Sequence, residues 1–340
     1  MGQLLPECKP ETPANRPRTG NFCWFGYLPP LGVRGVRPNR NSIQRYRGIA
    51  GLGLCVVDHL LLVDETDPGA QRVRYHERRV APGGMVATAL AQAAALGCRC
   101  EVLSVVGEDD EGRFVTRALR DAGVGVRRLL RSRKCPTSVA VVLVSERTGE
   151  RRFLVPDRRD VERRAPRFDL APSQGDTLLL VDGHYPAQAM RAVRKARREG
   201  AVVIGDFSDS RPGYHELLPF VDYPIVPIEF GRSWGTKTAR ETVLALREEY
   251  GGRPVVTEGK RGALAWQDGR LRRIPAPRVK VRDTTGAGDV FHGAFAAGLY
   301  HGWDELESLR LAARAAAASC TALGGQTRLL SRREMRRRAA

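Results

Sequence analysis

The sequence has few aromatic residues, few acidic residues relative to its basic ones, and no long apolar run. Aromatic side chains make up 6% of the 340 residues, and 38 Asp and Glu stand against 56 Lys and Arg. No stretch reaches the roughly eighteen apolar residues of a transmembrane helix, and residues 1–50 lack the apolar core of a secretory signal. These absences argue against a membrane-spanning or secreted protein.

The seven cysteines are scattered through the chain, and no two of them have the CxxC spacing. An odd, scattered set is not the pattern of a disulfide framework or of a zinc site. Thiols stay reduced in the cytoplasm, where structural disulfides are rare. We therefore expect a cytoplasmic protein with free thiols and without zinc.

The formal net charge of +18 suggests nucleic-acid binding. The excess is mostly arginine, however, spread over predicted helix faces such as 191–198 and over the C-terminal residues 331–340. No aromatic residues alternate with these charges to stack on bases. We interpret the charge as a general basic surface, which attracts anionic substrates without binding a specific nucleic acid.

The chain divides into three parts by composition and periodicity. Residues 1–46 are rich in Pro and Arg and show no helix or strand period, which predicts a disordered extension or translated sequence upstream of the true start. Residues 47–330 have the regular patterns of a folded domain. Residues 331–340 form a basic C-terminal tail.

Strand and helix patterns alternate along the folded part, as the apolar runs at 177–181, 202–204, 223–226 and 255–257 show. Such alternation implies parallel strands joined by helical crossovers. We predict an α/β fold with a doubly wound, mostly parallel sheet flanked by helices. Short strands near 60–80 and a hairpin at 139–155 are also predicted.

The segment 281–291 carries the clearest chemical signal of the chain. The turn Gly286-Ala287-Gly288 has no bulky side chain, so its backbone N–H groups can approach a ligand closely. A run of small apolar residues follows and predicts a buried helix, whose N-terminus favours an anion. Asp289 stands beside this anion site, where accepting a proton from an attacking hydroxyl would explain a carboxylate.

Two further polar residues follow a purely apolar strand. Asp182 and His184 stand at its carboxyl end, and residues at such ends line the crevice of parallel sheets. We expect both to face a substrate, with a helix-capping or buried histidine as the alternative for His184.

The run Asp283-Thr284-Thr285-Gly286-Ala287-Gly288-Asp289, followed by Phe291, resembles the C-terminal signature of the PfkB carbohydrate kinase (ribokinase-like) family. The resemblance covers about residues 49–330. It implies that the Gly286–Gly288 turn is the anion hole for the transferred phosphoryl group and that Asp289 is the catalytic base. It also implies a small β lid, made from the strands near 60–80 and 139–155.

The resemblance assigns further residues to the sugar. Gly83 and Gly84 match the glycine pair against which sugar hydroxyls lie, and Asp58 matches an acidic residue that accepts their hydrogen bonds. Thr88 stands where the family usually has Asn, which weakens the likeness to true ribokinases. The residues implied for the nucleotide are Asp206, Arg211, Thr257, Gly259, Gly262, Thr284, Cys320 and Gly324.

The magnesium site of the family is altered in this chain. Pro227 replaces the usual Asn, and Glu229 stands one residue short of the usual Glu. Either Glu229 substitutes as the metal ligand from a shifted loop, or ATP and water supply most of the ligands of the ion. The resemblance further implies ATP and Mg²⁺ as cofactors, leaves a monovalent cation such as K⁺ open, and allows a homodimer.

The expected activity is ATP-dependent phosphorylation of a sugar hydroxymethyl group. Arginines 151, 152, 158 and 159 beside the lid favour an anionic acceptor, a phosphosugar or a sulfosugar such as sulfofructose, as one alternative. A nucleoside kinase is another, with Tyr75 and Phe153 as the aromatic residues near the lid. The non-enzymatic alternative is a catalytically inactive sugar-sensing protein, and the presence of Asp289 argues against it.

Overall fold

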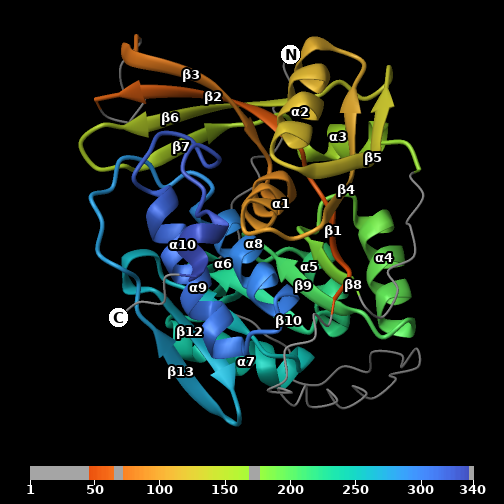
Figure 1. The fold of residues 1–340 in the computed structure, drawn as a ribbon, viewed down its shortest axis with the longest axis vertical. Coiled ribbons are helices and arrows are strands. Elements are labelled where there is room, and N and C mark those ends of the chain that lie inside the picture. The colour runs from red at the N-terminus through yellow and green to blue at the C-terminus, as the bar shows by residue number, and fades with distance from the viewer. Residues whose placement is uncertain (1–45, 65–71, 168–176, 337–340) are drawn as a thin grey trace, which may run out of the picture. The chain divides into compact units, whose positions relative to one another are not determined.

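The structure is a computed structural model of the chain, in which residues 46–64, 72–167 and 177–336 are described (Figure 1). The predicted extension lies outside these residues except for Tyr46. The side chain of Tyr46 is buried at 5% exposure in the main hydrophobic core. The folded domain therefore begins at or before Tyr46.

The domain is built on a nine-stranded sheet in the order β13-β12-β11-β10-β9-β8-β1-β4-β5. Neighbouring strands are parallel from β5 to β11, whereas β12 and β13 are antiparallel additions at one edge. This confirms the doubly wound, mostly parallel sheet. The strands are β1 (Gly48–Leu52), β4 (Cys100–Gly107), β5 (Val124–Ser132), β8 (Thr177–Val181), β9 (Val202–Asp206), β10 (Tyr223–Pro227), β11 (Val255–Thr257), β12 (Ala263–Gln267) and β13 (Arg270–Ile274).

Helices cover both faces of this sheet because successive side chains of its strands point to opposite faces. On β8, Leu178 and Leu180 belong to one core and Leu179 and Val181 to the other. The first core contains α1 (Met85–Ala95), α2 (Asp110–Asp121), α8 (Ala287–Tyr300), α9 (Glu305–Ser319) and α10 (Arg332–Arg336). The second contains α4 (Pro186–Arg198), α5 (Pro212–Leu217), α6 (Ile228–Trp234) and α7 (Ala239–Tyr250), with α3 (Arg158–Arg164) beside it.

The predicted lid is a separate four-stranded sheet in the order β3-β2-β6-β7. Its strands are β2 (Val56–Val63), β3 (Tyr75–Gly83), β6 (Ser138–Ser145) and β7 (Arg151–Leu154). Alternate apolar residues of β2 and β6 form a small core of their own with Leu323. Other apolar side chains of the lid are exposed, among them Tyr75 at 55% and Phe153 at 47%. The homodimer stays a prediction.

Three local features differ from the sequence-based expectation. The apolar run at 49–57, which by itself predicts one strand, is divided after Leu52. The Asp182 carboxylate lies where a side chain at Gly53 would be and accepts a hydrogen bond from the N–H of Leu54. β5 and α3 were not predicted. The predicted boundary at residue 330 is too early, because Met335 of α10 is buried in the core. No helix in the described ranges combines the length and apolar character needed to cross a membrane.

Candidate active site

The turn before α8 places the predicted anion hole at a helix N-terminus. Gly286 is the N-cap of α8 and has φ 71°, a left-handed conformation that favours glycine. A Cβ at Gly286 would also lie 2.9 Å from the Cα of Gly325, so the two backbones are in contact. α8 itself is almost entirely buried, because its residues are small and apolar on every side. The turn is thus fixed by a rigid helix.

The side chain of Asp283 fixes the conformation of this turn through hydrogen bonds. Asp283 was not among the predicted site residues. Its Oδ1 accepts hydrogen bonds from the backbone N–H of Thr285 at 2.8 Å and from its hydroxyl at 2.7 Å. Its Oδ2 accepts from the N–H of Gly324 at 2.7 Å. The Asp283 side chain is 1% exposed, so these bonds compensate a buried carboxylate. The arrangement ties the anion-hole turn to the loop after α9.

The amides at the mouth of the turn remain available to a ligand. Within the described residues, no acceptor is found for the N–H groups of Gly286, Gly288 and Asp289. A Cβ at Gly288 would meet no atom within 4 Å, so open space lies beside the backbone. Free N–H groups at a helix N-terminus facing open space favour an anion such as a phosphoryl group.

Asp289 lies in the first turn of α8 beside these amides. Burial raises the pKa of its carboxyl well above the usual range, and the charges of Asp206 and Asp58 raise it further. His292 and Arg151 act in the opposite direction. A carboxyl with a raised pKa is a stronger base, which suits proton transfer from a hydroxyl.

The predicted sugar residues come to the same place from the lid and α1. A Cβ at Gly83 would lie 2.1 Å from the Asp58 carboxylate, so this carboxylate rests on the backbone of β3. Gly84, at φ 97°, is the N-cap of α1, and a side chain there would strike the carbonyl of Leu54. Burial and the charge of Asp283 raise the pKa of Asp58 to about 7.

Thr88 and the loop after α9 close the site on the side of Gly286. The Thr88 hydroxyl accepts a hydrogen bond of 3.1 Å from Gln326, and its methyl group faces Gly286. Gly324, at φ 92°, faces Leu60 of the lid. Four segments distant in the sequence therefore meet around one turn.

Asp182 and His184 are joined to each other at the end of β8. Asp182 is fully buried, and its carboxylate accepts hydrogen bonds from the N–H of Leu54 at 2.7 Å and of His184 at 2.9 Å. The His184 ring lies 3.1 Å from the same carboxylate, which together with these bonds lowers the pKa of Asp182. The expectation that Asp182 faces substrate is therefore corrected, because its oxygens hold the β1–β2 connection.

Asp206 is the last residue of β9, and Arg211 lies in the segment that follows this strand. Asp206 is 4% exposed, and burial raises the pKa of its carboxyl well above the usual range. The charge of Asp206 raises the pKa of Asp289, so the carboxyl groups at the end of β9 and at the start of α8 influence each other's ionisation. Arg211 pairs with Asp209 at 2.5 Å and lies over the ring of Tyr214.

Comparison with known proteins decides the family. The family model described as "pfkB family carbohydrate kinase" matches residues 47–332. The chain belongs to the pfkB family of carbohydrate kinases. It is accordingly a carbohydrate kinase enzyme with a ribokinase-like fold.

Curated relatives and solved structures agree with this assignment. The kinase is 26% identical to a ribokinase of Bacillus subtilis over 85% of its chain and 98% of that protein. It is 35% identical to a ribokinase of Lactococcus lactis over 44% of its chain, a match that spans about half (49%) of that relative. A putative ribokinase from Agrobacterium tumefaciens has the same fold at 24% identity, with a TM-score of 0.78 over 85% of this chain and 96% of that one. An Escherichia coli putative ribokinase II solved with ATP and Mg²⁺ gives 0.71 at 21% identity, over 85% and 97%.

The remaining predicted nucleotide residues lie on two loops of the kinase. Thr257 ends β11, and Gly259 follows at φ 55° with open space where a side chain would be. Gly262 instead closes the turn after Gly259. Its N–H donates to the Gly259 carbonyl, its own carbonyl accepts from the N–H of Glu258, and a Cβ would lie 2.0 Å from the Ile274 carbonyl. The assignment of Gly262 to the nucleotide is therefore corrected to a structural turn position.

Cys320 and Thr284 connect the loop after α9 to the lid. The Cys320 carbonyl accepts from the N–H groups of Arg282 and Asp283. The Thr284 hydroxyl donates to the carbonyl of Gly149 in the β6–β7 turn at 3.3 Å and accepts from Arg151 on β7. The lid hairpin thus touches the segment that leads into the anion hole.

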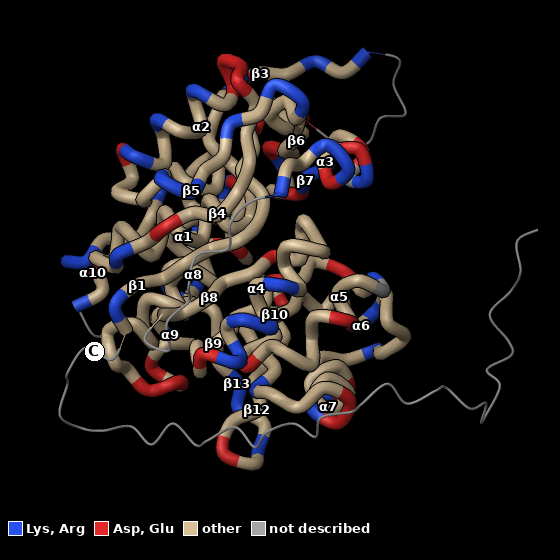
Figure 2. The backbone as a smooth tube through the Cα atoms, turned by 90° about the vertical axis from the view of Figure 1, so that its right-hand side faces the viewer, with Lys and Arg blue, Asp and Glu red and all other residues tan. Residues whose placement is uncertain are grey.

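Glu229 lies in the first turn of α6 and has an exposed side chain, 65% accessible, with Arg232 at 3.7 Å. An exposed carboxylate is free to bind a hydrated metal ion, so its role as magnesium ligand stays a prediction. Figure 2 shows that Lys and Arg occur on elements throughout the view, including α2, α3 and α10. This distribution agrees with a general basic surface.

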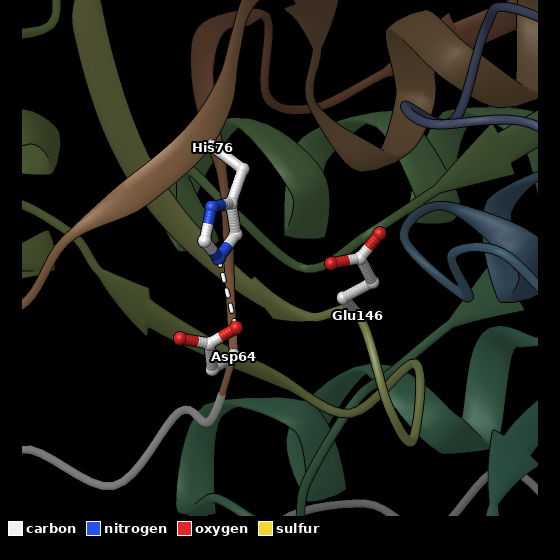
Figure 3. A group of neighbouring side chains, drawn as sticks. All are labelled: Asp64, His76 and Glu146. Carbon is white, nitrogen blue, oxygen red and sulfur yellow. Dashed lines mark hydrogen bonds and ion pairs between the residues drawn. The ribbon is translucent and has the colours of Figure 1, made fainter.

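One group of potential metal ligands lies elsewhere, at the far end of the lid (Figure 3). Ligand atoms of Asp64, His76 and Glu146 lie within 4.8 Å of one another, and His76 is hydrogen-bonded to Asp64 at 2.8 Å. All three residues are exposed. Six residues of strand separate Asp64 from Asp58, which places the group about 20 Å from the sugar residues. The group is therefore not part of the active site.

Proposed function

We propose that this kinase transfers the γ-phosphoryl group of ATP to a hydroxymethyl group of a sugar, with Asp289 as general base. The observation that carries the proposal is the coincidence, in one turn, of unpaired amides, open space beside Gly288 and a carboxyl of raised pKa. These are the parts that phosphoryl transfer needs: donors for the developing charge and an acceptor for the proton.

The acceptor sugar would lie between the lid and α1. Asp58 would accept hydrogen bonds from its hydroxyl groups, because a carboxylate only accepts and can hold two donors. The backbone at Gly83 and Gly84 would let the sugar ring approach closely. The hydroxymethyl group would then reach Asp289, which takes its proton as the oxygen attacks phosphorus.

The nucleotide would approach α8 from the opposite side. Phosphate oxygens would meet the N–H groups of Gly286 and Gly288, and the loop at Thr257 and Gly259 offers a hydroxyl and an unobstructed backbone. Small residues around Cys320 and Gly324 would border the adenine. Mg²⁺, held by ATP, water and Glu229, would neutralise phosphate charge when bound.

An anionic sugar is the alternative acceptor that a specific contact favours. Of the three predicted arginines whose side chains are described, Arg151, Arg152 and Arg159, only Arg151 has a contact that brings it to the site. Its guanidinium donates to Thr284, and its charge lowers the pKa of Asp289. A guanidinium there would bind a phosphate or sulfonate on the acceptor. A nucleoside acceptor is less favoured, because Tyr75 and Phe153 are exposed at 55% and 47%.

The test is Asp289→Asn together with an acceptor screen. Neutral sugars, phosphosugars, sulfosugars and nucleosides are compared in a coupled assay for ADP. With the true acceptor, kcat should fall about 10²–10⁴-fold in Asp289→Asn, while the ATP dissociation constant changes little.

Asp110→Asn is the matched control, because Asp110 also stands in the first turn of a helix but pairs with Arg113 at the surface. It should retain turnover. Wild-type turnover in Asp289→Asn would exclude the proposed mechanism. The absence of ATP consumption with every acceptor would instead favour the inactive sugar-sensing alternative.

A further inference from the structure

His292 connects the anion-hole helix to the central sheet. It lies one turn beyond Asp289 in α8, and its side chain is almost fully buried. Its Nδ1 is 2.7 Å from the carbonyl oxygen of Gly288, and its Nε2 is 3.1 Å from that of Ile225 on β10. The ring is therefore in contact with the backbone of the predicted anion hole itself.

The same ring faces Asp206 at the end of β9. Nδ1 lies 3.3 Å from Oδ2 of Asp206, and both side chains are about 5% exposed or less. Among the described residues, Oδ2 of Asp206 has no hydrogen-bond partner. A buried carboxylate oxygen without compensation is costly, so the adjacent imidazole is the group placed to compensate it.

The hydrogen bonds fix how many protons the pair holds. A carbonyl oxygen only accepts, so Gly288 and Ile225 each favour an N–H on the ring nitrogen that faces them. Neutral imidazole has one N–H and imidazolium has two. Burial lowers the pKa of His292 and raises that of Asp206, which favours moving the proton toward the carboxyl. Whether the proton resides on His292 or on Asp206, the net charge of the pair is zero.

We propose that His292 is a positioning residue that cancels the charge of Asp206 and holds the Gly288 carbonyl, so that Asp289 remains the charged carboxylate beside the transferred phosphoryl group. The inference rests on the proposed function and goes beyond it. The charges that act on the pKa of Asp289 are those of Asp206, His292, Asp58 and Arg151, and the charge of Asp182 acts on that of Asp206.

The pH profile distinguishes this role from a merely structural one. A base must lose its proton first, so kcat/KM rises with pH through the pKa of Asp289. In His292→Asn no imidazole is left to share a proton with Asp206, so Asp206 carries an uncompensated charge wherever it is ionised. This charge raises the pKa of Asp289, and the rising limb should move to higher pH by about one unit. Below the limb kcat/KM should fall about tenfold, and at high pH it should approach the wild-type value.

The double variant His292→Asn/Asp206→Asn sharpens the test. Removing both charges should return the limb to the wild-type pH. His301→Asn is the control, because His301 follows α8 at its other end and is likewise hydrogen-bonded to a carbonyl, that of Leu96 at 2.9 Å. It should leave the limb in place. An equal loss of kcat/KM at every pH in His292→Asn, or a double variant that keeps the upward shift, would overturn the proposal.

A second measurement does not depend on turnover. Imidazole ¹⁵N and carboxyl ¹³C signals of His292 and Asp206 can be followed in the free protein between about pH 5 and pH 8, where ordinary histidines titrate. We expect the pair to retain its extra proton throughout. A neutral His292 beside an ionised Asp206 would refute the inference even if an acceptor is found. Retention of the proton in a protein that phosphorylates no acceptor would leave the pair intact and remove the proposed function.

Discussion

The turn before α8 and the lid hairpin β6–β7 meet at Thr284, but they are held in place by different means. On the α8 side, Asp283 is 1% exposed and accepts three hydrogen bonds, and His292 is bonded to two backbone carbonyls. On the lid side, Arg151, Arg152 and Phe153 are exposed and bound mainly by strand pairing.

This difference suggests that the turn before α8 sets the geometry of phosphoryl transfer, whereas the lid hairpin sets the preference for the acceptor. Preorganised donors at the phosphoryl group act only if they do not move, which needs a buried and satisfied frame. A lid has to open for the sugar to enter, so its contacts with the core have to be few and exposed. We therefore expect substitutions around α8 to change turnover and stability, and substitutions on β7 to change acceptor preference.

The largest effect is expected at Asp283. In Asp283→Asn, an NH2 group, which cannot accept a hydrogen bond, replaces one of the two carboxylate oxygens. The buried N–H of either Thr285 or Gly324 therefore loses its acceptor. The free energy of unfolding should fall by about 2–3 kcal/mol, measured by urea denaturation, and kcat should fall more than about tenfold. Asp304→Asn, at the exposed N-cap of α9, should cost about 1 kcal/mol or less and spare kcat. Equal losses in the two variants would show that Asp283 is not an anchor.

Gly286 and Gly288 provide a matched pair two residues apart. Gly286→Ala forces a left-handed φ on alanine and a contact with Gly325, so it should lower stability by about 1–2 kcal/mol. Gly288→Ala meets no protein atom, so thermal unfolding should be unchanged. Its methyl group would nevertheless occupy the space proposed for the phosphoryl group, and kcat should fall about tenfold or more. Full activity in Gly288→Ala would place the phosphoryl group elsewhere.

Arg151 and Arg152 test the lid side of the comparison, because neighbouring residues of β7 point to opposite faces. If the acceptor is anionic, Arg151→Gln should raise its KM about tenfold, and the effect should weaken as salt increases. Arg152→Gln should change KM less than about twofold. Michaelis curves at two salt concentrations measure both. A KM that neither variant alters indicates a neutral acceptor.

The effect at Asp58 depends on pH. Its pKa of about 7 in the folded protein exceeds the usual 3.8, so the folded state binds its proton more tightly than the unfolded state. Stability is therefore lost as pH rises from about 4 to 7, and the penalty is complete above pH 7. Asp58→Asn removes the penalty and should raise Tm by a few degrees at pH 8 but hardly at pH 4. An equal gain at both pH values would exclude this explanation.

Local chemistry was sufficient to predict the turn and the buried helix on which the proposed site is built. Gly286-Ala287-Gly288 followed by Asp289 and a small-residue helix specifies a left-handed N-cap and free amides whatever surrounds it. The alternation of strands and helices from 177 to 257 likewise predicted the parallel sheet. Each of these features depends on residues close together in the sequence, where backbone geometry is set by neighbours.

The missed features depend on distant partners. β5 is rich in arginine and has weak alternation, so only its pairing with β4 makes it a strand. Asp182 was expected to face substrate, but its carboxylate accepts a hydrogen bond from a backbone N–H of the β1–β2 connection. His292 looked like one more residue of a buried helix. The signal that could have identified it was a titratable side chain one turn from Asp289, the carboxylate proposed as the base.

The sequence alone determined the family, the layered α/β fold, the turn that favours an anion and the carboxylate beside it, because these follow from composition, periodicity and a contiguous motif. Only the tertiary structure decided which acidic residues are free to act. Asp58, Asp182, Asp206, Asp283 and Asp289 are alike as side chains. Burial, neighbouring charges and the available N–H groups make Asp182 and Asp283 structural, and leave Asp289 with a raised pKa at the open end of a helix.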